Sequence, residues 1–178
     1  MRSEKEKMVA GELYLSSDLE LVEGRVLAKA LFKRYNHHPD QSLLRELLGT
    51  CPDEIVVEPD FKCDYGYNIH LGENFYSNFD LVILDGCEVR IGRNCLIGPS
   101  VSLYTASHPL DLEVRRSGLE FGAPISIGDD VWIGGRTVIN PGVTLGNNVV
   151  VASGSVVTKS FHDNCLIGGV PAKLIKTL

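Results

Sequence analysis

The chain has 178 residues, of which 44% are hydrophobic and 22% are charged, and its formal net charge is -6 at pH 7. This length and composition are typical of one globular domain with a sizeable core, and the negative charge argues against generic nucleic-acid binding. No apolar run approaches the roughly 18 residues of a membrane span and no signal-peptide core follows the charged start MRSEKEK, so we expect a cytoplasmic protein.

Residues 1–54 are expected to form a helical segment. Within it, DLELVEGRVLAKALFKRYNHH has apolar residues at helical spacing. The following PDQSLLRELLG predicts a second, short helix that begins between Pro39 and Ser42 and ends at Gly49. Because repeat stacks leave their ends open, we expect these helices to cover one end of the repeat domain that follows.

Residues 55–178 are expected to form a repeat domain with a period of six residues. From Ile127 the chain divides into six consecutive hexads, IGDDVW, IGGRTV, INPGVT, LGNNVV, VASGSV and VTKSFH. Each begins with a branched aliphatic residue, and the fifth position is small or β-branched except at Phe161. A period of six fits neither a helix nor a hairpin. It fits a triangular coil of short strands, three hexads to a turn, with the aliphatic residues inward and glycine or asparagine in the turns.

Less regular hexads precede this run, beginning at Leu71 and Ile91, and two extra residues between them, Val89 and Arg90, predict a small bulge. The segment 109–123 lacks the repeat and is rich in charge, so we expect a loop that leaves the coil. The final GGVPAKLIKTL is expected to end the coil in a strand or a short helix.

Charge and cysteine placement constrain the ligands. Residues 1–122 carry 13 basic and 20 acidic side chains, whereas residues 123–178 carry 4 and 3, so an anionic ligand should prefer the C-terminal part. The cysteines are odd in number and include no CxxC pair: Cys51, Cys63, Cys87, Cys95 and Cys165. We therefore expect neither a disulfide framework nor a zinc knuckle, but small and mostly buried side chains.

Several long motifs, in order and nearly end to end, resemble the maltose and galactoside O-acetyltransferases of the hexapeptide-repeat class, and most closely the maltose enzymes. They are EKEKMVAGELY, RYNHHPD, CDYGYNIHLGENFYSNFD, YTASHPLD, IGDDVWIGGRTVINPGVTLGNNVVVASGSVVTK and GGVPAK. The resemblance implies an all-β solenoid, a left-handed parallel β-helix with an N-terminal helical cap, a protruding loop and a C-terminal cap. It also implies a homotrimer, with active sites between subunits, that moves acetyl from acetyl-coenzyme A to a maltose- or glucose-like hydroxyl.

A sugar hydroxyl is a weak nucleophile at neutral pH, and a general base within hydrogen-bond reach accelerates its attack by roughly 10²- to 10⁴-fold. The family's motif histidine matches His108 in YTASHPLD. The resemblance implies that His108 takes the proton during direct attack on the thioester, without a metal, and that the Gly135 N–H holds the oxyanion. The alternative for His108 is a loop histidine satisfied by a nearby carbonyl.

By the same resemblance, Asn78 contacts the acceptor, and Asp64 and Asp85 are further acceptor-site candidates; turn residues without a role are the alternative for all three. The galactoside enzymes have an acceptor-binding aspartate where this chain has Ser16, and a second acidic residue where it has Gly86. The acceptor is therefore open: it can be a galactoside, an amino sugar or a lipo-oligosaccharide instead of a maltose-like sugar.

Coenzyme A needs cations near its phosphates and a backbone-lined groove along its pantetheine arm. The resemblance assigns this role to the late hexads and the C-terminal segment: Gly135, Ser153, Thr158, Lys159, Lys173 and Lys176. The galactoside enzymes have arginine at the last two positions, and lysine loses the bidentate geometry. Trp132 either packs against the pantetheine or covers a subunit joint.

Two other classes of protein share such hexads. A carbonic anhydrase would need three histidines around zinc, and only His70 and His108 fall in the central coils. A non-catalytic β-helix scaffold would explain the hexads but not the histidine motif, the charged loop or the helical cap.

Overall fold

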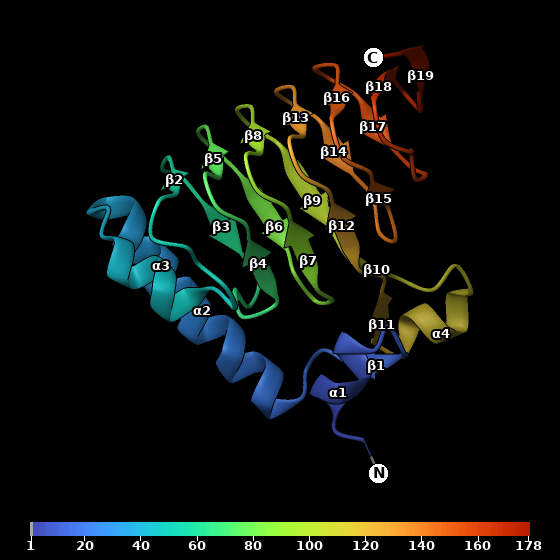
Figure 1. Cartoon of the computed structure of the whole chain (residues 1–178). Helices are drawn as coiled ribbons and strands as arrows, with labels where there is room; N and C mark the ends of the chain where they lie inside the picture. Colours follow the sequence, from blue (N-terminus) through green and yellow to red (C-terminus); the bar gives the residue numbers. More distant parts are fainter. Residues whose placement is uncertain (1) are drawn as a thin grey trace.

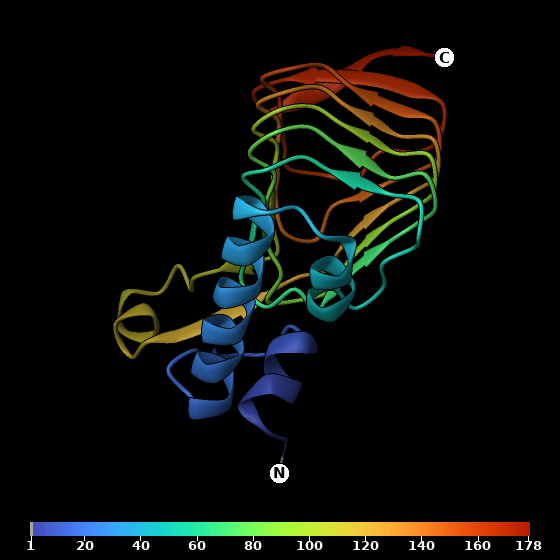
Figure 2. The same cartoon turned by 90° about the vertical axis from the view of Figure 1, so that its left-hand side faces the viewer.

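The computed structural model describes residues 2–178; Met1, the first residue of the predicted helical segment, lies outside them. Three parallel sheets form the faces of a stacked triangular coil, which confirms the left-handed parallel β-helix (Figures 1 and 2). Face 1 contains β2 (Val56–Val57), β5 (Tyr76–Ser77), β8 (Leu96–Ile97), β13 (Trp132–Ile133), β16 (Val149–Val151) and β18 (Cys165–Gly169), with β19 (Ala172–Thr177) antiparallel at its edge. Face 2 contains β3 (Lys62–Cys63), β6 (Val82–Leu84), β9 (Ser102–Tyr104), β14 (Val138–Ile139) and β17 (Val156–Val157). Face 3 contains β4 (Ile69–Leu71), β7 (Val89–Ile91), β12 (Ile125–Ile127) and β15 (Thr144–Leu145).

The first residues of the hexads make the core, as predicted. Ile127 pairs with Leu145 and Ile133 with Val151, one turn of the coil apart, and all four side chains are buried. Burial of each such side chain stabilises the fold by roughly 1.5 to 3 kcal/mol. The fifth positions also point inward, so each hexad contributes two residues to the core.

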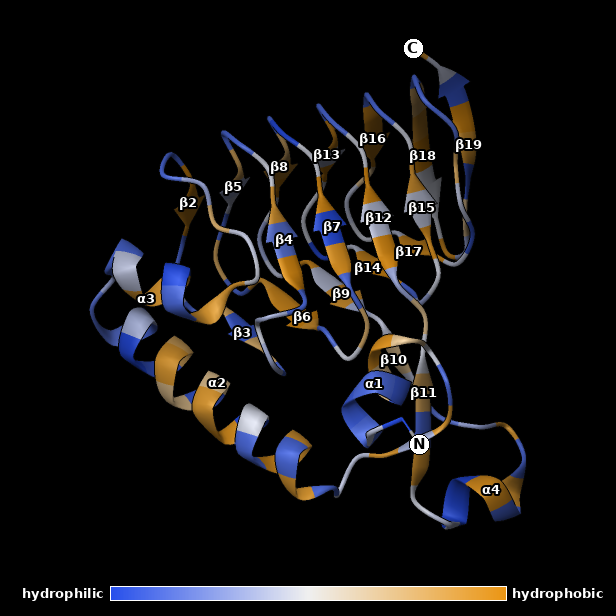
Figure 3. Cartoon of the chain, turned by 60° about the horizontal axis from the view of Figure 1, so that its bottom comes forward, coloured by the Kyte–Doolittle hydropathy of each residue, from blue (hydrophilic) through white to orange (hydrophobic). Residues whose placement is uncertain are grey.

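The turns differ in part from the prediction. Asparagine or aspartate takes the left-handed conformation at the third corner, which leads from face 3 to face 1, as at Asn94 and Asp130, and these turns are hydrophilic (Figure 3). Glycine at the second hexad position is explained by close packing between coils, not by a turn conformation. A Cβ on Gly128 would lie 2.7 Å from the carbonyl carbon of Gly146 and 2.8 Å from the Asn147 nitrogen, so glycine lets neighbouring coils approach.

Gly128→Ala is therefore expected to destabilise the protein by about 1 to 3 kcal/mol, because backbone atoms of the next coil must move. Thermal unfolding should show a melting temperature lower by roughly 2 to 4 °C per kcal/mol. Asn140→Ala, at the same hexad position where the fold already accommodates a side chain, is the control. Equal melting temperatures for both variants would contradict this explanation of the glycine.

The predicted bulge at Val89 and Arg90 is wrong. Both residues lie in β7 and pair in register with β4. The two extra residues lie instead at the second corner, which leads from face 2 to face 3, and the same corner is lengthened at residues 64–68. The third and largest extension of this corner is the segment between β9 and β12.

The N-terminal helices are α1 (Glu4–Val9), α2 (Leu19–His37) and α3 (Gln41–Leu47). Leu31 and Phe32 of α2 and Leu44 of α3 join the core of the first coils, so these helices cover one end of the solenoid, as predicted (Figure 1). The start of α2 extends beyond this cap, because Leu21 packs in a separate cluster with Met8, Tyr14 and Tyr65. None of the helices within residues 2–178 is both long and apolar enough to cross a membrane.

The predicted loop 109–123 does leave the coil, but much of it is ordered. It contains α4 (Leu112–Arg116) and β11 (Leu119–Gly122). β11 is the central strand of an antiparallel sheet, between β10 (Ala106–Ser107) and β1 (Tyr14–Leu15). The loop, which we call the arm, is thereby tied to the N-terminal segment.

The C-terminal segment ends the coil in a strand, β19, which returns along β18. In the described chain all five cysteines are free; four are buried and Cys51 is half-buried, which fits the expectation of small core residues.

Candidate active site

A pocket of about 330 Å³ opens at the second corner, where the arm meets the N-terminal segment. It is lined by Tyr14, Ser16, Arg25, Asp64, Tyr65, Leu84, Ala106, His108 and Glu120. Three predicted site residues, Ser16, Asp64 and His108, thus come together from distant parts of the chain. Tyr14 and Glu120 were missed because only the pairing of β1 with β11 brings them to the pocket. Arg25 was missed because it reaches the pocket from α2, where no motif marks it.

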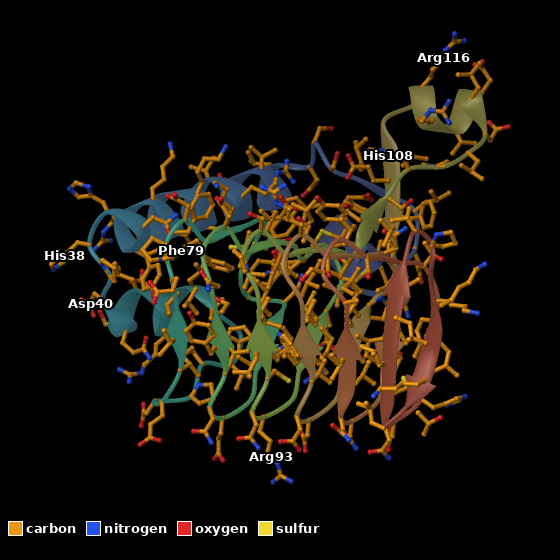
Figure 4. The ribbon with its side chains drawn as sticks, turned by 90° about the horizontal axis from the view of Figure 1, so that it is seen from above. His38, Asp40, Phe79, Arg93, His108 and Arg116 are labelled. Atoms are coloured by element: carbon orange, nitrogen blue, oxygen red, sulfur yellow. The ribbon has the colours of Figure 1, made fainter. Side chains whose placement is uncertain are left out.

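His108 directly follows β10, so the antiparallel pairing of β10 with β11 fixes where its backbone enters the pocket. The side chain is exposed and lies at the base of the arm, with Arg116 farther out (Figure 4). The loop-histidine alternative would require a hydrogen bond between the imidazole and a nearby carbonyl. Residues 2–178 contain no such hydrogen bond. The ring nitrogens are therefore available to a ligand in the pocket.

Asp64 lines the pocket and is half-buried. Burial raises the pKa of its carboxyl, the positive charge of Arg25 opposes this rise, and the charge of Glu120 adds to it. Arg25 is held in place because its guanidinium donates to the Tyr65 hydroxyl, at 2.6 Å, and to the Ser16 carbonyl, at 2.7 Å. The pocket wall therefore contains a carboxyl group, a fixed cation and hydroxyl groups, which suits a polar ligand.

Asp85 is placed differently from the prediction. It is fully buried behind the pocket, and its Oδ1 accepts hydrogen bonds from the backbone N–H groups of Asp64 (3.0 Å) and Tyr65 (2.9 Å). Its Oδ2 has no hydrogen-bond partner among the described residues. Asp85 thus stabilises the backbone conformation of the second corner and does not line the pocket.

Burial raises the pKa of Asp85 to about 6, against the opposing effect of the backbone N–H donors. The folded protein therefore binds this proton more tightly than the unfolded chain, so the contribution to stability is complete below about pH 4 and declines through about pH 6. Between about pH 4 and pH 6 and above, the free energy of unfolding is expected to lose roughly 3 kcal/mol as Asp85 ionises.

Asp85→Asn cannot ionise and is expected to flatten the dependence of the unfolding free energy on pH between about 4 and 6. Denaturant unfolding across this range measures the difference. Asp80→Asn, an exposed aspartate in a neighbouring turn, should keep the parental slope. Parallel profiles for the parent and Asp85→Asn would rule out Asp85 as the source.

Asn78 lies at the first corner, which leads from face 1 to face 2, and does not line the pocket with His108. Its side-chain oxygen accepts the N–H of Phe79 at 2.8 Å. Gly135 and Ser153 lie at the same corner in later coils, where the Gly154 N–H donates to the Gly135 carbonyl at 2.9 Å. Among residues 2–178, no hydrogen bond uses the Gly135 N–H, so this group is a free donor.

The other predicted coenzyme residues fall into two groups. Trp132 points outward from face 1 and pairs with Val150 of the next coil. Val150 pairs with Leu166, which pairs with Lys176, so these four residues form one row across the face. Lys173 pairs with Gly168 at the end of β18, on the side of the first corner. Thr158 and Lys159 are exposed at the second corner of the last coil and are not brought to the others within one chain.

Among the described residues, no group of three or more histidine, cysteine or acidic side chains could hold a metal ion. His70, the second histidine of the central coils, instead shares a hydrogen bond with Thr50, with 3.0 Å between Nδ1 and Oγ1.

Comparisons with known proteins agree with this fold. Residues 7–52 match the maltose acetyltransferase hexapeptide capping motif, and residues 124–159 match the bacterial transferase hexapeptide repeats. The galactoside O-acetyltransferase of Escherichia coli is 42% identical, over 97% of this chain and 88% of its own length.

Two solved structures are especially similar. A maltose O-acetyltransferase from Clostridium difficile superposes with a TM-score of 0.97 and 45% identity, over 99% of this chain and 98% of that one. A hexapeptide-repeat acetyltransferase from Vibrio cholerae, complexed with acetyl-coenzyme A, has a TM-score of 0.93 and 41% identity, over 99% of both chains. The chain is an acetyltransferase and belongs to the maltose and galactoside O-acetyltransferase family of hexapeptide-repeat proteins.

Proposed function

We propose that this acetyltransferase transfers acetyl from acetyl-coenzyme A to a hydroxyl of a maltose- or glucose-like sugar, with His108 as general base. The observation that carries the proposal is the pocket in which an unengaged imidazole faces hydroxyl, carboxyl and guanidinium groups. Such groups bind sugar hydroxyls, and the histidine can accept a proton at neutral pH. The names of the similar maltose and galactoside enzymes support a sugar acceptor.

In this mechanism His108 takes the proton of the acceptor hydroxyl as the oxygen attacks the acetyl carbonyl. A C–O bond forms, the C–S bond breaks, and the leaving thiolate of coenzyme A receives the proton that His108 took from the hydroxyl. The negative charge that develops on the carbonyl oxygen is stabilised by a backbone donor, for which the free Gly135 N–H is suited. The thioester is already activated, so no covalent enzyme intermediate is needed.

The proposed coenzyme site runs along the first corner and face 1, past Gly135 and Ser153 to Lys173 and Lys176. Backbone groups and small side chains would line the pantetheine arm, and the lysines would approach the phosphates as point charges. Trp132 is 55% exposed and lies in the row that leads to Lys176, so it suits either contact with the pantetheine or cover at a subunit joint. Thr158 and Lys159 would meet the coenzyme from a neighbouring subunit.

The proposal includes a homotrimer with active sites between subunits. Asn78 and Gly135 lie at the first corner and His108 lies in the second-corner pocket, so only a neighbouring copy can bring the two sets together. Exposed apolar side chains support such contacts: Leu96 is 50% exposed on face 1 and Phe79 is 57% exposed at the first corner. A cytoplasmic location belongs to the proposal because acetyl-coenzyme A is available there.

The experiment that tests the function combines coenzyme A binding with release of free thiol from acetyl-coenzyme A. The acceptors are maltose, glucose, a galactoside and glucosamine. Release that depends on maltose or glucose is the expected result. Coenzyme binding with release only on another acceptor would reassign the substrate, and coenzyme that does not bind would favour a non-catalytic scaffold.

A further inference from the structure

A second cavity, which we call the notch, lies beside the catalytic pocket, between α2 and the end of β3. It has a volume of about 220 Å³ and is lined by Val22, Arg25, Val26, Lys29, Cys63 and Asp64. The catalytic pocket shares Arg25 and Asp64 with it, so the two cavities adjoin. The proposed mechanism makes no use of the notch.

The lining of the notch suits an aromatic side chain. Val22 and Val26 of α2 are 36% and 64% exposed, so a single copy leaves apolar surface of the notch uncovered. Arg25 and Lys29 add positive charge, which is attracted to the face of an aromatic ring. The volume is also sufficient, since a cavity of about 150 Å³ binds benzene. A phenyl group therefore matches the notch in size, apolar surface and charge.

Phe79 presents such a phenyl group at the surface. Its side chain is 57% exposed at the first corner, between β5 and β6. Its backbone is fixed, because its N–H donates to the Asn78 side chain at 2.8 Å and its carbonyl accepts the N–H of Ser100 at 2.8 Å. Phe79 is thus an apolar projection that is held in one place, and covering it would remove its ring from water.

The phenyl group and the notch of one chain are too far apart to meet. Cys63, in the wall of the notch, pairs with Ile83 near the end of face 2, whereas Phe79 precedes that face. Among the described residues, those that line the notch accordingly do not include Phe79. A phenyl group from the first corner can therefore reach the notch only from another copy of the chain.

The heights of the two features along the solenoid fit a second copy. The notch adjoins the first coil, β2 to β4, and Phe79 lies in the second coil, β5 to β7, so they differ by about one strand spacing, roughly 4.8 Å. Neighbours in a closed oligomer are related by rotation without translation along its axis. Where that axis follows the solenoid, coils of equal number lie at equal height, and the first corner of one copy faces the second corner of the next.

We propose that the notch binds the phenyl group of Phe79 from a neighbouring copy, so that each subunit inserts one aromatic side chain beside α2 of the next. This inference rests on the proposed function, whose subunit arrangement places the first corner of one copy against the second-corner pocket of another. The contact is heterologous, because the notch and Phe79 are different surfaces of one chain, and rotation closes it. Since Arg25 and Asp64 line both cavities, the inserted side chain also supports the wall of the catalytic pocket.

Cysteine crosslinking tests the contact directly. Phe79→Cys and Val26→Cys are made on separate chains and co-expressed, each with Cys51→Ser, because Cys51 is the one native cysteine that is not buried. Mild oxidation is expected to give a covalent dimer that contains both variants, whereas neither variant alone should form it. Leu27→Cys is the control partner for Phe79→Cys and should not crosslink, because Leu27 is 60% exposed on α2 but does not line the notch.

Phe79→Ala tests the energy of the same contact. It is expected to raise the dissociation constant of the oligomer by about 30-fold or more, as removal of a buried aromatic anchor does at other interfaces. Sedimentation equilibrium over a range of protein concentrations measures this change. The far-UV circular dichroism should match that of the parent, because the side chain is exposed within one chain. Leu27→Ala should associate as the parent does.

The inference is overturned if the co-expressed Phe79→Cys and Val26→Cys chains do not crosslink, if Phe79→Ala associates like the parent, or if the parent sediments as a monomer. Thiol release from acetyl-coenzyme A is measured separately on the parent. A crosslink without sugar-dependent release would leave the docking site standing and remove the proposed function. Release without a crosslink would do the reverse, so the two failures are distinguishable.

Discussion

His108→Ala is expected to lower kcat/KM for acetyl transfer by about 10²- to 10⁴-fold, the usual contribution of a general base. Alanine removes the imidazole, and the bases that remain in the pocket are the carboxyl groups of Asp64 and Glu120. Carboxylates are ordinarily weaker bases than imidazole, and that of Glu120 already accepts hydrogen bonds from the Tyr14 and Ser16 hydroxyls. Initial rates of thiol release with the preferred sugar measure the effect.

Coenzyme A binding should be unchanged in His108→Ala, since the residues proposed to contact the pantetheine arm and the phosphates are others, such as Ser153 and Lys173. His38→Ala is the matched control, because His38 is an exposed histidine at the far end of α2 (Figure 4). A His108→Ala enzyme as active as the His38→Ala enzyme would remove His108 from the mechanism.

Phe75→Ala is expected to destabilise the protein by about 3 to 5 kcal/mol, the range for loss of a buried phenyl ring. Phe75 is 1% exposed and belongs to the inward row of fifth positions, between Ile55 of the preceding coil and Cys95 of the next. Its ring fills the space beside the small Cys95, so truncation leaves a cavity in the core.

Chemical denaturation at a fixed protein concentration measures this loss, because association between subunits would add to the apparent stability. Leu27→Ala, which truncates an apolar side chain that is 60% exposed on α2, should change stability by less than about 0.5 kcal/mol. If Phe75→Ala unfolds at the same denaturant concentration as Leu27→Ala, the core does not depend on the ring.

The repeat domain could be predicted from the sequence because a period of six links position in the hexad directly to burial. Ile133 and Val151 are eighteen residues apart and pair in neighbouring coils, as three hexads to a turn require. The bulge at Val89 was misplaced because the hexad count shows that two residues are extra but not which corner takes them. In the structure Val89 and Arg90 pair in register with β4, so the two extra residues lie at the second corner, where the pocket forms.

The pocket could be predicted only in part. The resemblance in the sequence pointed to His108, Asp64 and Ser16, and the fold brings these together. Glu120 carries no local signal, because only its strand pairing with Tyr14, 106 positions away in the sequence, brings it to the pocket. Asp85 was predicted as an acceptor-site candidate, but its side chain is buried and accepts hydrogen bonds from the backbone of the second corner.

The most direct test of sugar O-acetyl transfer is to identify the product. The enzyme is incubated with acetyl-coenzyme A and maltose, and the free thiol released is compared with the amount of O-acetylated sugar identified by mass spectrometry and NMR. Equal amounts of thiol and a singly O-acetylated maltose are the predicted result. Thiol release without acetylated maltose, or acetyl found only on the amine of glucosamine offered in its place, would contradict the account.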